Sequence, residues 1–73
     1  MKTKYKYFNF THDASTDIWA CKTNSKVDAT IVLGTAEYYP VWKRYCFFPA
    51  NDTVYSDTCL SDIAKFLNEL NGL

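Results

Sequence analysis

The stretch that decides the fold is residues 56–72, which read SDTCLSDIAKFLNELNG. Ser56 is suited to cap the start of a helix, and Asp57 falls in the first turn, where the helix dipole favours an anion. Apolar residues then recur at steps of 3, 4 and 3, with Ala64 on the same stripe: Leu60, Ile63, Leu67 and Leu70. Gly72 is suited to the left-handed residue that closes many helices. The stretch predicts one amphipathic helix with a single apolar face.

Four extended segments precede this helix, and polar or proline-containing turns separate them. The predicted strands are Lys4–Thr11, Ile18–Thr23, Val27–Gly34 with a continuation through Glu37, and Val41–Phe48. The predicted connections are a polar loop over His12–Asp17, a turn over Thr23–Lys26 and a reversal at Tyr38–Pro40, since Pro40 has no N–H for a central ladder. Gly34 is expected to mark a bulge in the third strand.

These elements predict an α+β fold. An antiparallel meander of three to four strands is followed by one carboxyl-terminal helix, which packs on one face of the sheet. The 73 residues are enough for one core and one domain, residues 1–73. With 48% hydrophobic residues, a formal net charge of zero, two glycines and two prolines, the composition is neither disordered nor collagen-like.

The aromatic residues exceed what one covered face requires. They make up 18% of the chain, and the fourth predicted strand is apolar on both of its sides. The first predicted strand has a phase slip, because Tyr5 and Tyr7 share one face whereas Phe8 and Phe10 share the other. This slip indicates either a bulge near Phe8 or a strand with both faces covered. Since one helix covers one face, the surplus predicts a contact surface on the other.

The densest aromatic cluster predicts a protein-binding site around the third reversal. Its residues are Tyr38, Tyr39, Trp42, Arg44 and Tyr45. Tyrosine, tryptophan and arginine are the side chains enriched in binding hot spots. The same aromatics can instead pack among themselves in a thick core, and the sequence leaves this alternative open. If they are exposed, either a protein partner or a second copy of the chain, in a homodimer, covers them.

A nucleic-acid site is the alternative hypothesis for the same chain. Its candidate contacts are Lys4, Tyr5, Lys6, Tyr7 and Lys43, because proteins hold single strands with cations placed beside aromatic stacking platforms. Residues 1–27 carry five lysines against two aspartates, a net charge of +3, whereas residues 28–73 carry three cations against six acids, a net charge of −3. The zero total argues against a protein whose affinity comes mainly from neutralising phosphates.

The sequence carries no recognisable catalytic or metal-binding pattern. The only histidine, His12, falls in the predicted polar loop, and no pattern places a cysteine beside it. The cysteines Cys21, Cys46 and Cys59 form no C-x-x-C pair and are expected to be reduced and mostly buried. A zinc site of three cysteines and one histidine assembled in space is the remaining alternative. We therefore expect no enzyme, no cofactor and no metal site.

The amino terminus predicts a cytoplasmic protein. Its first eight residues are basic and aromatic and lack the apolar region of a signal peptide. No apolar run approaches the ~20 residues that span a bilayer. We therefore expect no contact with a membrane.

A longer pattern runs from Leu33 into the helix. It consists of Leu33-Gly34, then Trp42-Lys-Arg-Tyr45-Cys-Phe47-Phe-Pro49, then Thr53-Val-Tyr55-Ser56 and the amphipathic helix. This pattern, which covers about half of the chain, resembles a family of small phage- and prophage-encoded proteins of unknown function. The resemblance implies a bacterial-virus context and an accessory role, such as binding a host protein in the bacterial cytosol. Residues 1–27 take no part in it.

Overall fold

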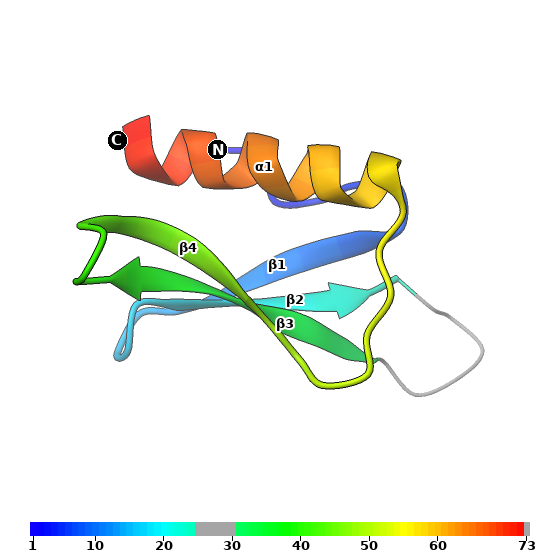
Figure 1. Ribbon diagram of the computed structural model, residues 1–73, viewed down its shortest axis with the longest axis horizontal. Coiled ribbons are helices and arrows are strands. Elements are labelled where there is room, and N and C mark those ends of the chain that lie inside the picture. The colour runs from blue at the N-terminus through cyan, green and yellow to red at the C-terminus, as the bar shows by residue number, and fades with distance from the viewer. Residues whose placement is uncertain (25–30, 73) are drawn as a thin grey trace.

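The protein is a four-stranded antiparallel sheet with one helix lying along one face (Figure 1). The computed structural model describes residues 1–24 and 31–72. The elements are β1 (Phe8–Asp13), β2 (Ile18–Thr23), β3 (Val32–Tyr39), β4 (Arg44–Pro49) and α1 (Asp57–Gly72). The strand order is β1-β2-β3-β4, so each strand pairs with its neighbour in sequence. This meander with one helix confirms the predicted α+β fold.

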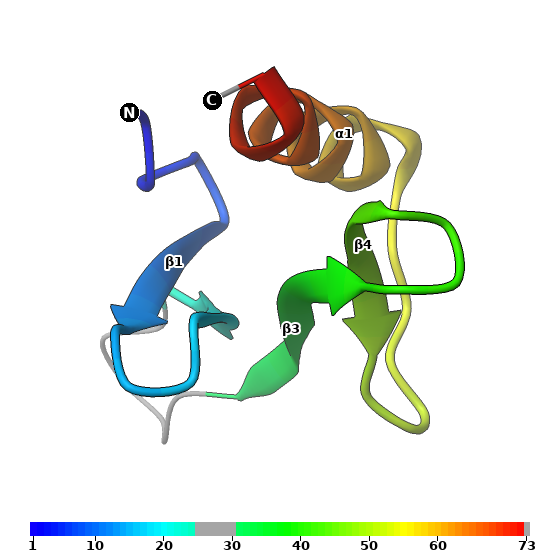
Figure 2. The same ribbon diagram turned by 90° about the vertical axis from the view of Figure 1, so that its left-hand side faces the viewer.

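The helix and the sheet form two layers. Figure 2 looks along α1 and shows it on one side of the twisted sheet, with β1 and β4 at opposite edges. Buried apolar side chains fill the space between the layers: Tyr5, Phe8, Phe10, Cys21, Ala36, Ile63, Phe66 and Leu70. One side of the sheet therefore carries the core, as predicted.

The amino-terminal segment does not belong to β1, so the predicted strand Lys4–Thr11 is wrong at its start. The N–H of Tyr5 donates to the carbonyl of Phe8 (2.9 Å), and the N–H of Phe10 donates to the carbonyl of Thr3 (2.8 Å). The chain thus reverses between Tyr5 and Phe8, and residues 3–5 run back along the outer edge of β1. This reversal explains the phase slip without a bulge, because it turns Tyr5 as well as Phe8 and Phe10 into the core.

The other strands differ from expectation mainly at their ends. β1 continues through Asp13 into the predicted loop, and β2 has the predicted bounds. Residues 25–30, which include the predicted start of the third strand, lie outside the described residues. β3 extends through Tyr39, so the reversal comes later than predicted and occupies residues 40–43, the hairpin tip. Trp42 therefore lies in this tip and not in a strand.

Ser56 caps α1 as predicted. Its hydroxyl accepts a hydrogen bond from the N–H of Cys59 (3.1 Å), and its carbonyl accepts the first helical bond from Leu60 (3.0 Å). This pattern satisfies donors that the first helical turn leaves free. The predicted end is wrong, since α1 extends through Gly72 and this glycine has no positive φ.

The buried face of α1 is rotated from the predicted stripe. Leu60 is 54% exposed and Ala64 is also exposed, whereas Ile63, Phe66 and Leu70 are buried. The ring of Phe66 stacks on Phe10 with centroids 3.7 Å apart. A stripe through residues 59, 63, 66 and 70 fits the helical period as well as the predicted one, and it buries the large aromatic ring in place of Leu60.

Gly34 allows β3 to pass closely between its neighbours. It lies opposite Cys21 on β2 and opposite Pro49 on β4, and the register of β2 and β3 shifts beside it because Leu33 is an extra residue. The bulge expected at this glycine is thus found at the adjacent position. A Cβ atom at Gly34 would lie only 2.5 Å from the carbonyl oxygen of Phe48 and 2.7 Å from Cζ of Phe47.

Replacing Gly34 with alanine should destabilise the fold by about 1–3 kcal/mol, because the added methyl group meets backbone as well as a packed ring. The matched control is Gly72→Ala. A Cβ there meets nothing within 4 Å, and alanine favours a helix by up to about 1 kcal/mol over glycine. Urea unfolding of both variants measures the difference. Equal stability of Gly34→Ala and the wild type would contradict this account of the packing.

The cysteines should differ sharply in reactivity. Cys21 is fully buried, and burial, with a smaller contribution from the charge of Cys59, raises the pKa of its thiol to about 12. At pH 8 about one such thiol in ten thousand is ionised, whereas Cys46 and Cys59 are only partly buried. We expect a disulfide reagent to label two thiols in the native protein and a third only after unfolding. In the native Cys46→Ser variant, the reagent should label only one thiol. Equal labelling of all three thiols in the native wild type would contradict the burial of Cys21.

Candidate functional site

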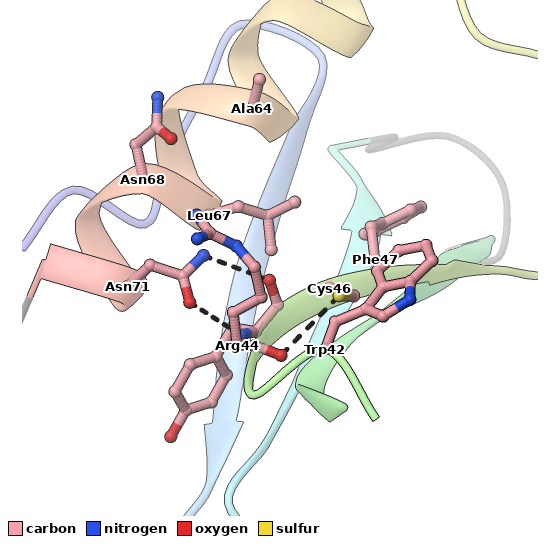
Figure 3. A pocket seen from close by; sticks show the side chains of 9 residues that line it. Trp42, Arg44, Cys46, Phe47, Ala64, Leu67, Asn68 and Asn71 are labelled. Atoms are coloured by element: carbon pink, nitrogen blue, oxygen red, sulfur yellow. Dashed lines mark hydrogen bonds between the residues drawn. The ribbon is translucent and has the colours of Figure 1, made fainter. Parts of the chain in front are cut away.

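A groove lies between α1 and the outer edge of β4 (Figure 3). Its volume is about 350 Å³. From the helix it is lined by Ala64, Leu67, Asn68 and Asn71, and from the hairpin by Trp42 and residues 44–47. We call this feature the β4 groove. It is open to solvent along one side, and its apolar wall comes from Leu67, Ala64 and Phe47.

Asn71 closes one end of the exposed edge of β4. Its Oδ1 accepts a hydrogen bond from the N–H of Tyr45 (2.7 Å), and its Nδ2 donates to the carbonyl of the same residue (3.2 Å). Figure 3 shows both bonds crossing from the helix to the strand. The side-chain amide therefore replaces the two bonds that a further strand would make with Tyr45.

The edge of β4 is open at Phe47. Backbone groups alternate in direction along an antiparallel strand, so the N–H and C=O of Phe47 point outward as those of Tyr45 do. Among the described residues, no hydrogen bond from beyond the sheet reaches the N–H of Phe47. Pro49, the next residue in this direction, has no N–H. One strand residue therefore presents unpaired backbone groups beside the groove.

Arg44 is the only charged residue that lines the β4 groove. It is exposed, and within residues 1–24 and 31–72 the only ion pair joins His12 and Asp17. Among the described residues that line the groove, no acidic side chain competes for its guanidinium. The described part of the groove therefore combines an apolar wall with one positive charge that forms no ion pair there, and such a charge favours an anionic group in a ligand.

Aromatic rings at the hairpin tip flank the groove. Trp42 is 67% exposed although it is one of the largest apolar side chains. It contacts Tyr39 edge-on with ring centroids 5.2 Å apart, and Tyr39 contacts Phe48 in the same way at 5.9 Å. Trp42 is thus held by a neighbouring ring while most of its surface stays in water.

The predicted protein-binding cluster is divided by the sheet. Tyr38 and Tyr45 pair edge-on on the side of the sheet that carries α1, with ring centroids 5.6 Å apart, whereas Tyr39 and Trp42 lie with Phe48 on the other side. Trp42, Arg44 and Tyr45 line the β4 groove, and Tyr38 and Tyr39 do not. The cluster is thus neither wholly core nor wholly exposed.

The uncovered face is less apolar than the prediction required. Directly opposed residues point to the same face, and one row across that face reads Thr11, Ala20, Thr35 and Phe48. Glu37 lies on this face too and accepts a hydrogen bond from the hydroxyl of Thr35 (2.8 Å). The aromatic surplus is therefore local to the β3–β4 hairpin.

The residues of the nucleic-acid hypothesis do not form one surface. Tyr5 is only 8% exposed and belongs to the core. Lys4, Lys6 and Tyr7 are exposed beside the outer edge of β1, where the ammonium of Lys6 lies 5.3 Å from the Tyr7 ring. Lys43 lies in the hairpin tip, which joins β3 to β4 at the opposite side of the sheet. Among the described residues, these cations and rings therefore lie at opposite sides of the sheet.

The helix residues of the groove were not foreseen as site residues. Leu67 and Ala64 fall on the predicted core stripe, and nothing in the sequence places Asn68 or Asn71 beside β4. An asparagine near a helix end ordinarily indicates a cap. The contact between Asn71 and Tyr45 joins residues 26 positions apart, and a single sequence has no signal for such a pairing.

His12 is engaged in a small polar cluster at the β1–β2 turn. Its Nε2 lies 2.8 Å from Oδ1 of Asp17, and its ring stacks on Trp19 with centroids 4.1 Å apart. The hydroxyl of Tyr45 donates to Oδ2 of Asp17 at 2.5 Å. The hydrogen bond from Tyr45, followed by that from His12, holds the pKa of Asp17 below its usual value. Among the described residues, no three His, Cys, Asp or Glu side chains gather as metal ligands.

Asp17→Asn should lower the melting temperature at pH 7. Asparagine tolerates the positive φ of this position (55°) but brings no carboxylate to the hydroxyl of Tyr45. Because the folded-state pKa of Asp17 lies below the unfolded value of about 3.9, its stabilising effect is present above that pH and is lost as the pH falls through the folded-state pKa. Melting curves of the two proteins should therefore converge in acid.

Tyr45→Phe is the control for this effect, because it keeps the ring but removes the hydrogen bond that lowers the pKa of Asp17 most. Its melting temperature should depend on pH in the acid range less steeply than that of the wild type. A difference between Asp17→Asn and the wild type that stays constant from pH 7 into acid would contradict the charge-based explanation.

Comparison with known proteins finds no relative of this chain. No family model matches the chain, and neither does any curated protein or any solved structure. In the part of the chain that the structure describes, no helix has both the length and the apolar character needed to cross a membrane. The candidate site is therefore described by the β4 groove and the hairpin tip alone.

Proposed function

We propose that this protein is a small non-catalytic binding module that captures a protein partner through the β4 groove and the hairpin tip. The observation that carries the proposal is the 67% exposure of Trp42 at the mouth of an open groove. Leaving a large aromatic surface in water forgoes stabilisation that burial would bring, about 25 cal/mol per Å² of apolar area. Contact with a partner recovers that stabilisation.

The chemistry of the site supports a protein as the partner. Tryptophan, tyrosine and arginine are the residues that most often dominate binding energy, and Trp42, Arg44 and Tyr45 all line the groove. The volume of about 350 Å³ can hold one or two side chains of a partner and falls at the small end of ligand sites. The apolar wall next to a single cation suits a peptide segment better than a uniformly charged backbone.

A nucleic acid is less well supported as the partner. Its candidate residues lie at opposite edges of the sheet, and one of them, Tyr5, is in the core. The total charge of zero provides little counterion release on binding phosphates. Self-association through the hairpin tip is the other way to cover Trp42, and it is separated from a foreign partner by measuring the mass in solution.

We also propose that the protein acts in the cytosol of a bacterial host. The pattern from Leu33 onward, with its resemblance to small phage and prophage proteins, supports an accessory protein that acts on a host protein in the bacterial cytosol. An accessory protein of this kind redirects a host activity by occupying a surface and needs no chemistry of its own. Neither His12, which is engaged with Asp17, nor the scattered acids support a catalytic role.

Trp42→Ala and Arg44→Ala should each weaken partner capture by about thirtyfold or more, as truncation of a hot-spot residue does. Because the side chains of Trp42 and Arg44 are exposed, the melting curves of both variants should stay cooperative and close to that of the wild type. The measurement is capture from bacterial cytosol on immobilised protein, followed by titration of the recovered partner. The control is Val54→Ala, which removes an apolar side chain that is 91% exposed outside the groove.

Three results would contradict the proposal. Capture that nuclease treatment abolishes would identify a nucleic acid as the partner. A concentration-dependent mass in sedimentation, lost in Trp42→Ala, would identify a second copy of the chain. Loss of cooperative unfolding in Trp42→Ala would place this side chain in the structural core.

A further inference from the structure

We infer that the β4 groove binds the carboxyl terminus of an extended peptide, which adds a short strand beside β4 at Phe47 and places its terminal carboxylate on Arg44. This inference rests on the proposed function and specifies which part of a partner the groove takes. Three features of the groove carry it: one strand residue with unpaired backbone groups, a block at one end of that edge, and the one cation among the described lining residues, which lies at the blocked end.

The unpaired edge calls for an extended chain. The N–H and C=O of Phe47 point out of the sheet, and among the described residues nothing from beyond the sheet bonds to that N–H. An extended peptide satisfies such groups by adding a strand, and its alternate side chains then face the sheet edge. A helix supplies no backbone donors and acceptors in this geometry, because its own turns use them.

The block at Asn71 requires the added chain to stop. Tyr45 lies two residues from Phe47, about 7 Å along β4 at the usual rise of a strand. Its N–H and C=O are already bonded to the Asn71 side chain at 2.7 and 3.2 Å. A peptide that pairs with Phe47 and runs toward the hairpin tip meets this amide one step later. A chain that ends there fits, whereas a continuing chain must leave the edge.

The cation Arg44 lies at the end of the β4 edge that Asn71 blocks. Arg44 directly precedes Tyr45, and Figure 3 shows its side chain extending from β4 toward Leu67 and Asn71 of the helix. A chain that ends at Asn71 presents its terminal carboxylate in this region. Arginine matches a carboxylate with two parallel hydrogen bonds, and among the described residues no acidic side chain lines the groove. The last side chain of the peptide then rests on the wall made by Leu67 and Phe47.

The experiment uses a display library of random heptapeptides with free carboxyl ends, selected on the full-length protein. The best peptide is synthesised in three forms: with a free carboxyl terminus, with a terminal amide, and with two further residues after the terminus. We expect the amide and the extended form to bind at least about tenfold more weakly, as loss of a hydrogen-bonded ion pair predicts. Fluorescence anisotropy of the labelled peptides gives the affinities.

Two variants connect the effect with Arg44. Arg44→Gln should bind the acid and the amide with equal affinity, whereas Lys43→Gln, which removes the neighbouring cation outside the groove, should retain the preference for the acid. The amide resonance of Phe47 should move downfield and exchange more slowly in the peptide complex, which reports on the strand pairing. The acid and amide comparison on the wild type needs no variant and decides the inference even if Arg44→Gln folds poorly.

Several results would overturn the inference. Equal affinity of acid and amide on the wild type excludes the terminal carboxylate, and tight binding of the extended peptide excludes a chain that ends at Asn71. An unchanged Phe47 resonance excludes strand addition. If these occur while Trp42→Ala still abolishes protein capture, the proposed function stands and only its peptide terminus is wrong. If neither peptides nor proteins bind in a way that depends on Trp42, both fail.

Discussion

The stack of Phe66 on Phe10 is the contact on which the rest of the structure depends. The two rings are parallel within 2° and 3.7 Å apart, so they fix both the height of α1 above the sheet and its rotation. Large rings at this contact require small residues beside them. The neighbouring strands supply Cys21, Ala36 and Gly34 at the buried positions, and the ring of Phe47 comes within 2.7 Å of where a Gly34 side chain would begin. The core thus combines large rings on β1 and α1 with small residues on β2 and β3.

This position of the helix creates the site. Because α1 is held by Phe66 and Leu70 over the sheet, its last turn reaches the outer edge of β4, where Asn71 bonds to the backbone of Tyr45. The same placement turns Leu67 and Ala64 toward the strand edge as the wall of the groove. The groove is therefore a result of how the core is packed and does not depend on a separate loop. Trp42 reaches it from the hairpin tip and Arg44 from the start of β4, so both layers of the fold contribute to one surface.

The sequence predicted most of the fold and part of the site, and the gaps have physical causes. Local signals were strong for the Ser56 cap and for the bounds of β2, and both are confirmed. The prediction of which face of α1 is buried was wrong, because two helical stripes fit the same periodicity. Only packing against Phe10 decides between these stripes. The reversal after Tyr5 carries no glycine or proline, so the amino terminus was predicted as a continuous strand. Trp42 and Arg44 were predicted as a contact surface because exposed hot-spot residues have a compositional signature. Asn71 could not be found, since its role depends on a partner 26 residues away.

The edges of the sheet have a further consequence for how the protein behaves at high concentration. A four-stranded sheet rich in aromatic residues is the kind of structure that grows by adding strands from other molecules into fibres. Residues 3–5 bond along β1, and at β4 the Asn71 amide and the missing N–H of Pro49 leave a single residue open. A single open residue offers one N–H and one C=O, which are too few to template a stack of strands. Among the described residues, neither edge therefore presents a long run of unpaired backbone groups to strands of other molecules.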